Sequence, residues 1–144
     1  VILFLNITHS LFNLVFLLLL LQMKKKVLLV EDNIFLSDLY LDVLKDLNVK
    51  VEVARDGHEA YKMASKGGWD LILMDVIMPG IDGFEVVQRL IDNPPPKPNK
   101  SIVYWTNLDN QHELDQAKKL GDGYIMKGEV TPDELIKKIE PFLK

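Results

Sequence analysis

The chain of 144 residues contains no cysteine. Disulfide bonds, thiol nucleophiles and cysteine-ligated zinc sites are therefore excluded, and the composition suits a protein kept in a reducing compartment. Basic side chains do not predominate either, because 17 Lys and Arg stand against 21 Asp and Glu, for a formal net charge of -4. This balance provides no overall electrostatic attraction to nucleic acid.

Charged residues are also missing from Val1 to Gln22, and the first of them is Lys24. An apolar stretch of this length is typical of a transmembrane anchor, and the lysines after it would hold the rest of the chain in the cytoplasm. A secretory signal would need a basic amino-terminal region and a small-residue cleavage site, which are absent. The third interpretation is a mis-set start, with the natural protein beginning at Met23. We expect an apolar segment at residues 1–22 and one cytoplasmic domain at residues 23–144, with no output domain after it.

From residue 24 onward, short apolar runs alternate with helical patterns. The runs predict strands at residues 26–30, 49–54, 71–74, 101–105 and 123–126, and the patterns predict helices near residues 36–47, 56–66, 84–91 and 110–120 and from residue 131. Leu39 and Ile91 are expected on the buried stripes of the first and third helices, and Phe142 on that of the last. The proline-rich residues 93–98 should form a spacer. Strands that are apolar on both faces predict an α/β fold, in which helices cover both faces of a parallel sheet.

Polar side chains follow four of the predicted strands, at the point where each strand ends. They are Glu31 and Asp32, then Asp75, Thr106 and Lys127. Because open parallel sheets bind ligands beyond the carboxyl ends of their strands, we expect these five side chains to meet at one edge.

The residue types at this edge indicate phosphate chemistry. Carboxylates crowded together repel one another unless a cation intervenes, and an all-oxygen set suits Mg²⁺, which commonly joins carboxylates to a phosphoryl group. Lys127 supplies a positive charge for a phosphoryl oxygen, and Thr106 can donate a hydrogen bond to another. Asp75, at the end of a buried strand, is the natural nucleophile and would form an acyl phosphate.

Together these residues resemble the receiver domain of bacterial two-component response regulators, in particular the single-domain, chemotaxis-regulator-like type. The resemblance extends from Lys24 to Lys144 and is carried by the Glu31-Asp32 pair, the segment Met74-Asp75-Val-Ile-Met-Pro79 with Asp82-Gly83, Thr106 and Lys127. It implies a flavodoxin-like (βα)5 fold with strand order 2-1-3-4-5. It also implies magnesium-dependent transfer of phosphate to Asp75 from a histidine kinase or a phosphotransfer protein.

The resemblance further implies a role for each site residue. Glu31, Asp32 and Asp75 would bind the magnesium ion together with the main-chain carbonyl of Ile77, and Lys127 would pair with the phosphoryl group. Thr106 and Tyr124 would form a switch. Phosphorylation would draw Thr106 inward, let the Tyr124 ring turn and change the affinity for a downstream effector protein, so the output would be binding, not turnover.

Three features depart from the family's usual pattern. Gly128 follows Lys127 where proline is usual, which removes the low-cost route to a cis peptide bond and favours a more mobile loop. Asn107, after Thr106, is larger than the usual small residue and would restrict the approach of phosphodonors or water. Ile77 and Leu108 place apolar side chains beside Asp75, where polar ones would orient a hydrolytic water. We therefore expect slow self-dephosphorylation.

Other interpretations remain open. Asp32, Asp75 and Thr106 could each serve only as a local cap or turn residue, and Tyr124 could be a core aromatic. A receiver fold can act as a docking module without phosphorylation. An aspartate-nucleophile phosphohydrolase would need a second acid at Ile77. The remaining conspicuous side chains have structural interpretations: packing for Trp69 and Trp105, and surface positions for His58 and His112.

Overall fold

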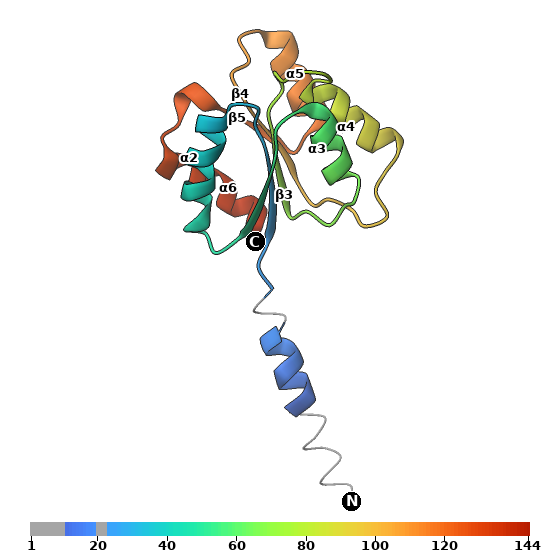
Figure 1. Cartoon of the computed structure of the whole chain (residues 1–144), viewed down its shortest axis with the longest axis vertical. Coiled ribbons are helices and arrows are strands. Elements are labelled where there is room, and N and C mark those ends of the chain that lie inside the picture. The colour runs from blue at the N-terminus through green and yellow to red at the C-terminus, as the bar shows by residue number, and fades with distance from the viewer. Residues whose placement is uncertain (1–10, 20–22) are drawn as a thin grey trace, which may run out of the picture.

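The computed structural model describes residues 11–19 and 23–144 of the chain. Five parallel strands form one sheet in the order β2-β1-β3-β4-β5 (Figure 1). The strands are β1 (Lys26–Val30), β2 (Lys50–Ala54), β3 (Leu71–Met74), β4 (Ile102–Thr106) and β5 (Gly123–Met126). The helices between and after them are α2 (Ile34–Lys45), α3 (Gly57–Ala64), α4 (Gly83–Asp92), α5 (Gln111–Leu120) and α6 (Pro132–Ile139), and 3-10 turns cover Lys127–Glu129 and Glu140–Leu143. The predicted fold and strand order are confirmed.

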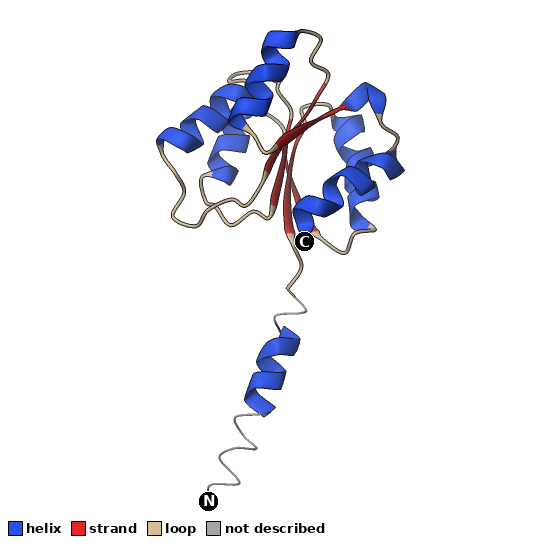
Figure 2. Ribbon diagram, turned by 180° about the vertical axis from the view of Figure 1, so that it is seen from behind, coloured by secondary structure: helices blue, strands red, loops and turns tan. Residues whose placement is uncertain are grey.

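The sheet lies between two helical layers, one of α2 and α6 and the other of α3, α4 and α5 (Figures 1 and 2). Alternate residues of the central strands face the two helical layers. In β1, Leu28 packs on the same side as Phe84 of α4, and Leu29 packs on the same side as Leu44 of α2. Both of these β1 side chains are fully buried, as expected for a strand in the middle of a parallel sheet. Trp69 and Trp105 are buried core residues, as predicted, whereas His58 and His112 are exposed.

Each main helix begins at a polar side chain that caps its first turn, and every one of these caps lies in a loop that follows a strand. The caps are Asn33, Asp56, Asp82, Asn110 and Thr131. An N-cap oxygen accepts a hydrogen bond from a free backbone N–H and so fixes where the helix starts. The predicted capping box of Thr131 and Glu134 is present. The caps keep the loops at the carboxyl edge short and defined.

The buried stripes of two helices differ from those predicted. Ile91 is 54% exposed and Leu39 is 47% exposed. In α4, Val86, Val87 and Leu90 face the core. Ile91 lies at the edge of this face, near the prolines of the spacer. The last helix also ends earlier than its apolar pattern suggested: α6 stops at Ile139 and continues as a 3-10 turn, because Pro141 has no backbone N–H to donate.

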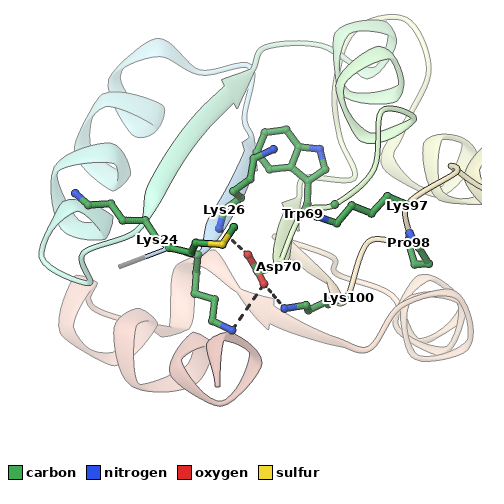
Figure 3. A pocket seen from close by; sticks show the side chains of 10 residues that line it. Lys24, Lys26, Trp69, Asp70, Lys97, Pro98 and Lys100 are labelled. Carbon is green, nitrogen blue, oxygen red and sulfur yellow. Dashed lines mark hydrogen bonds and ion pairs between the residues drawn. The ribbon is translucent and has the colours of Figure 1, made fainter. Parts of the chain in front are cut away.

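A lysine-lined pocket occupies the amino ends of the strands, opposite the edge where the predicted site lies (Figure 3). Asp70 is at its centre and accepts hydrogen bonds from the Lys26 backbone N–H, at 2.8 Å, and from the Lys100 ammonium. Burial opposes ionisation of this carboxyl, but the two hydrogen bonds outweigh it and lower the pKa of Asp70. The Lys26 ammonium lies 4.5 Å from the centre of the Trp69 ring. These contacts hold the beginnings of β1, β3 and β4 together.

Residues 11–19 form a helix whose apolar side chains are all at least half exposed. Among residues 11–19 and 23–144, none of the helices combines the length and the apolar character needed to cross a membrane. Residues 1–10 and 20–22 lie outside the described part of the chain, so the nature of the apolar segment at residues 1–22 stays a prediction.

Gly83, the first residue of α4, sets the position of the loop that begins with Asp75. A Cβ at Gly83 would lie 2.1 Å from the backbone oxygen of Asp75, far inside van der Waals contact. Gly83→Ala should lower the free energy of unfolding in urea by about 1–3 kcal/mol, as expected for overpacking at a rigid contact. Gly128→Ala is the matched control, because its Cβ would meet nothing nearer than 3.5 Å. Equal stability of the two variants would contradict this, because it would show that the backbone at Asp75 moves away from the added Cβ at little cost.

Candidate functional site

Three carboxylates meet at the carboxyl edge of the sheet, where β1 and β3 end side by side. Oxygen atoms of Glu31, Asp32 and Asp75 all lie within 4.8 Å of one another. The backbone fixes two of them, because the Glu31 N–H donates to Ala54 O at 3.0 Å and the Asp75 N–H donates to Val30 O at 3.2 Å. Glu31 and Asp75 are buried, whereas Asp32 is exposed. The acids therefore form a cluster with one member open to solvent.

The ammonium group of Lys127 lies between the two buried acids. Its Nζ donates to Glu31 Oε2 and to Asp75 Oδ2, each at 2.6 Å. Lys127 is the first residue of the 3-10 turn after β5. A residue that follows the edge strand β5 therefore binds acids that follow the central strands β1 and β3. Only 10% of the lysine side chain is exposed. Charge-assisted hydrogen bonds in such a poorly solvated place are stronger than those on the surface.

Glu31 shows the cost of placing these acids out of water. Burial raises the pKa of Glu31, although its hydrogen bond with Lys127 acts in the opposite direction. The Lys127 ammonium therefore does not fully offset the burial of Glu31. A further positive charge at the cluster would favour the ionised form of Glu31.

Thr106 ends β4, between the strands that deliver Asp75 and Lys127. It pairs in register with Met126, the residue before Lys127. Its hydroxyl oxygen is fully buried and has no hydrogen-bond partner. The Tyr104 hydroxyl and the Trp105 ring N–H, in the same strand, also have no partner. The place of the Thr106 hydroxyl at the end of its strand, toward the acids, is what distinguishes it from these two core groups.

Tyr124 lies on β5, two residues before Met126. It is half-buried, packs against the core on the α3, α4 and α5 side, and has the Lys118 ammonium 5.7 Å from its ring centre. Because side chains alternate along a strand, Tyr124 is on the same face of the sheet as the pair of Thr106 and Met126. The structure therefore places Tyr124 where either predicted role, switch or core aromatic, can be fulfilled.

The two apolar residues predicted beside Asp75 have different surroundings. Ile77 is 66% exposed, and its backbone N–H donates to Asp75 Oδ1 at 3.2 Å. Leu108 is only 3% exposed and belongs to the core cluster that contains Phe84. The loop after β4 therefore turns the Leu108 side chain into the core, and its predicted effect on Asp75 stays a prediction. The Ile77 carbonyl remains a predicted metal ligand.

Tyr40 is near the site, although the sequence indicated only that it belongs to the apolar stripe of its helix. Its ring packs edge-on against Trp105, with the ring centres 4.8 Å apart. Burial raises the pKa of Tyr40, and the charges of Lys127 and Glu31 act on its hydroxyl. One feature of the sequence could have indicated that Tyr40 lies near the site. Tyr40 is on the helix that follows the Glu31-Asp32 pair, and its hydroxyl is the polar group on an otherwise apolar stripe.

The carboxylate cluster fits a magnesium ion. All its donor atoms are oxygens, as Mg²⁺ prefers, and exposed Asp32 leaves room for the water molecules that this ion retains. The raised pKa of Glu31 and the unpartnered Thr106 hydroxyl indicate that both a cation and a group with oxygen acceptors are compatible with this edge.

Comparisons with known proteins agree with this geometry. The family model of the response regulator receiver domain matches residues 27–140. The chemotaxis protein CheY of Halobacterium salinarum is 32% identical over 106 residues, which cover 73% of this chain and 86% of that protein. Hybrid signal transduction histidine kinase B of Dictyostelium discoideum is 36% identical over 130 residues, or 83% of this chain. The chain spans only 7% of that kinase and 15% of the gliding motility regulatory protein of Myxococcus xanthus.

Solved structures show the same likeness. The chemotaxis protein CheY4 of Vibrio cholerae superposes with a TM-score of 0.68 at 30% identity, over 84% of this chain and all of that one. The response regulator TrrA of Thermotoga maritima, in complex with Mg(2+)-BeF, superposes with a TM-score of 0.69 at 28% identity, over 83% of this chain and 99% of that one. With the fold, the acidic cluster and the family match all in agreement, the chain belongs to the family of response regulator receiver domains.

Proposed function

We propose that the chain is a phosphoacceptor switch of a two-component phosphorelay, in which Asp75 receives the phosphoryl group. The observation that carries this proposal is the Lys127 ammonium, held 2.6 Å from both Glu31 and Asp75 beside a third acid. A purely structural ion pair would not need the exposed carboxylate of Asp32 beside it.

Phosphorylation is a displacement at phosphorus. An Asp75 carboxylate oxygen attacks the phosphoryl group of phosphohistidine, the P–N bond breaks, and the imidazole leaves with the electron pair and takes a proton from water. Lys127 must first release the Asp75 oxygen that it now binds, and it then pairs with the transferred group. Thr106 donates its hydroxyl hydrogen to a phosphoryl oxygen and so gains the partner that it lacks.

Magnesium would be held by Glu31, Asp32, Asp75 and the Ile77 carbonyl, and it would neutralise phosphoryl charge during transfer. The support for this assignment is the oxygen-only cluster at this edge and the Mg(2+)-BeF complex of the related TrrA.

The output of the switch is binding. The phosphoryl group adds nearly two negative charges and three acceptor oxygens. Movement of Thr106 toward them frees space for Tyr124, which alters the surface of α5, β5 and α6 for a downstream effector protein. The phosphodonor is a sensor histidine kinase or a histidine phosphotransfer protein, and nucleic acid is not a direct partner.

We infer a cytoplasmic location, which suits a chain without cysteine. If residues 1–22 are a membrane anchor, Lys24, Lys25 and Lys26 would lie at the inner surface of the membrane. The phosphoacceptor site, at the opposite end of the sheet, would then face the cytoplasm.

Labelling by a small phosphodonor tests the proposed function. With acetyl phosphate and magnesium, the chain should take up one phosphoryl group, and Asp75→Asn should take up none. Asp32→Asn should reduce labelling because it removes a metal ligand. Asp109→Asn is the matched control, since it changes an exposed acid in the loop after β4. Continuous multiple turnover would favour the phosphohydrolase, and a chain that is never labelled would be a docking module.

The buried lysine should matter for stability as well as for chemistry. Lys127→Met leaves Glu31 and Asp75 facing each other without a cation and should lower the free energy of unfolding by about 3 kcal/mol, measured in urea with a chelator present. Adding Glu31→Gln to this variant should restore part of the loss. The control is Lys45→Met, which removes an exposed lysine that lies 2.7 Å from Asp42 and should change stability little. Equal effects of the two lysine substitutions would contradict a shielded cluster.

Exposed Ile77 should make self-dephosphorylation slow. Ile77→Asn places an amide beside Asp75 that can orient an attacking water, and it should shorten the half-life of the phosphorylated protein by about tenfold, the worth of one good hydrogen bond. Ile77→Val keeps the side chain apolar and should leave the half-life unchanged. A half-life of only seconds for the unaltered protein in magnesium would refute the expectation.

A further inference from the structure

Asn107 and Gly128 are joined by a hydrogen bond across the carboxyl edge of the sheet. The Gly128 backbone N–H donates to Asn107 Oδ1, with the nitrogen and oxygen 2.8 Å apart. Asn107 directly follows Thr106, and Gly128 directly follows Lys127. The bond therefore connects the two loops that carry the hydroxyl and the cation of the site.

The position of this bond is set by where the sheet ends. The last aligned pair of β4 and β5 is Thr106 with Met126, so no strand pairing extends to Asn107 and Lys127. The chain after Met126 enters the 3-10 turn Lys127–Glu129, which has no side-chain cap of its own. The Asn107 amide oxygen accepts the N–H of the second residue of that turn and acts as a cap supplied by the neighbouring strand.

Both partners of the bond are positions at which the sequence departs from the family's usual pattern. A proline after the lysine would have no N–H to donate, and a small residue after the threonine would have no oxygen to accept it. Proline would also fix the backbone at that point, whereas glycine leaves it more conformational freedom. The two departures are therefore complementary: one supplies a donor and the other an acceptor, and together they restrain the turn.

We propose that Asn107 is a positioning residue for Lys127, acting through the Gly128 N–H in place of the rigidity that a proline would give. This inference rests on the proposed phosphoacceptor function and adds a link between the switch hydroxyl and the phosphate-pairing lysine. Since Thr106 and Asn107 are consecutive, displacement of Thr106 toward the phosphoryl group pulls on the turn that starts with Lys127 and leads into α6.

The direction in which Asn107→Ala changes the rate of Asp75 labelling distinguishes a positioning role from a steric one. If Asn107 only obstructed phosphodonors, Asn107→Ala would accelerate labelling of Asp75 by acetyl phosphate. As a positioning residue, its loss should slow labelling by about fivefold, the effect of one missing hydrogen bond. Stability should change little, because both partners are exposed to water that can replace the bond.

A second measurement shows whether Asn107 acts through Lys127. In the Lys127→Met background, Asn107→Ala should have no further effect on the labelling rate. In the Asn107→Ala background, Gly128→Pro should recover the rate, whereas Gly128→Ala, which keeps the N–H and does not fix the backbone, should not. An unchanged or faster rate in Asn107→Ala, or the same slowing with and without Lys127, would overturn the proposal.

The experiments distinguish failure of the proposed Asn107–Gly128 link from failure of the phosphoacceptor function. Labelling of the unaltered protein, lost in Asp75→Asn, establishes the function before any Asn107 variant is compared. Independently of labelling, amide hydrogen exchange at Gly128 should be faster in Asn107→Ala than in the unaltered protein. Equal exchange rates would show that the hydrogen bond does not persist in solution, and the proposal would fall even if Asp75 is phosphorylated.

Discussion

The ammonium group of Lys127, shared between two buried carboxylates, is the interaction on which the rest of the carboxyl edge depends. Glu31 and Asp75 end adjacent strands in the middle of the sheet, where their backbone hydrogen bonds leave them little freedom to separate. Without a cation between them, one of the acids would have to bind a proton or move. β5 places that cation by ending one residue before Lys127. The same arrangement brings three carboxylates and one ammonium group together, and this all-oxygen set of acids is compatible with a divalent ion.

The fold followed from simple patterns in the sequence. Short apolar runs such as residues 71–74 are buried strands, as expected when a run too short for a helix alternates with helical patterns along the chain. Capping residues such as Asp82 and Thr131 marked the helix starts correctly, because their effect is local. Ile91 and Leu39 were placed wrongly, because their burial depends on which neighbouring elements cover the helix. Phe142 packs against the core as predicted, although Pro141 ends the regular helix just before it.

Most of the site was predictable for the same topological reason. A parallel sheet brings the carboxyl ends of its strands to one edge, so strand-terminal polar residues must lie near one another. Leu108 and Tyr40 escaped this reasoning. Leu108 lies two residues beyond the end of β4, and the path of the loop directs its side chain into the core. Tyr40 lies on a helix packed on the sheet, where the charges of Lys127 and Glu31 act on its hydroxyl, and this placement is set by tertiary packing and not by spacing along the chain.

Two departures from the family's pattern acquire a common explanation in three dimensions. Asn107 and Gly128 are far apart in sequence, and separately each suggested a local consequence: a more crowded entrance and a looser loop. Their hydrogen bond shows that one departure supplies a donor and the other an acceptor. The two positions become neighbours only because β4 and β5 pair side by side.

A crystal structure of the chain with magnesium and beryllofluoride, which imitates an aspartyl phosphate, tests the central claim most directly. The beryllium should be bonded to Asp75, with Lys127 moved from Glu31 to a fluoride and the Thr106 hydroxyl hydrogen-bonded to another. If Asp75 stays unmodified while Lys127 still bridges it to Glu31 at saturating beryllofluoride, the cluster is a structural ion pair and not a phosphoacceptor site.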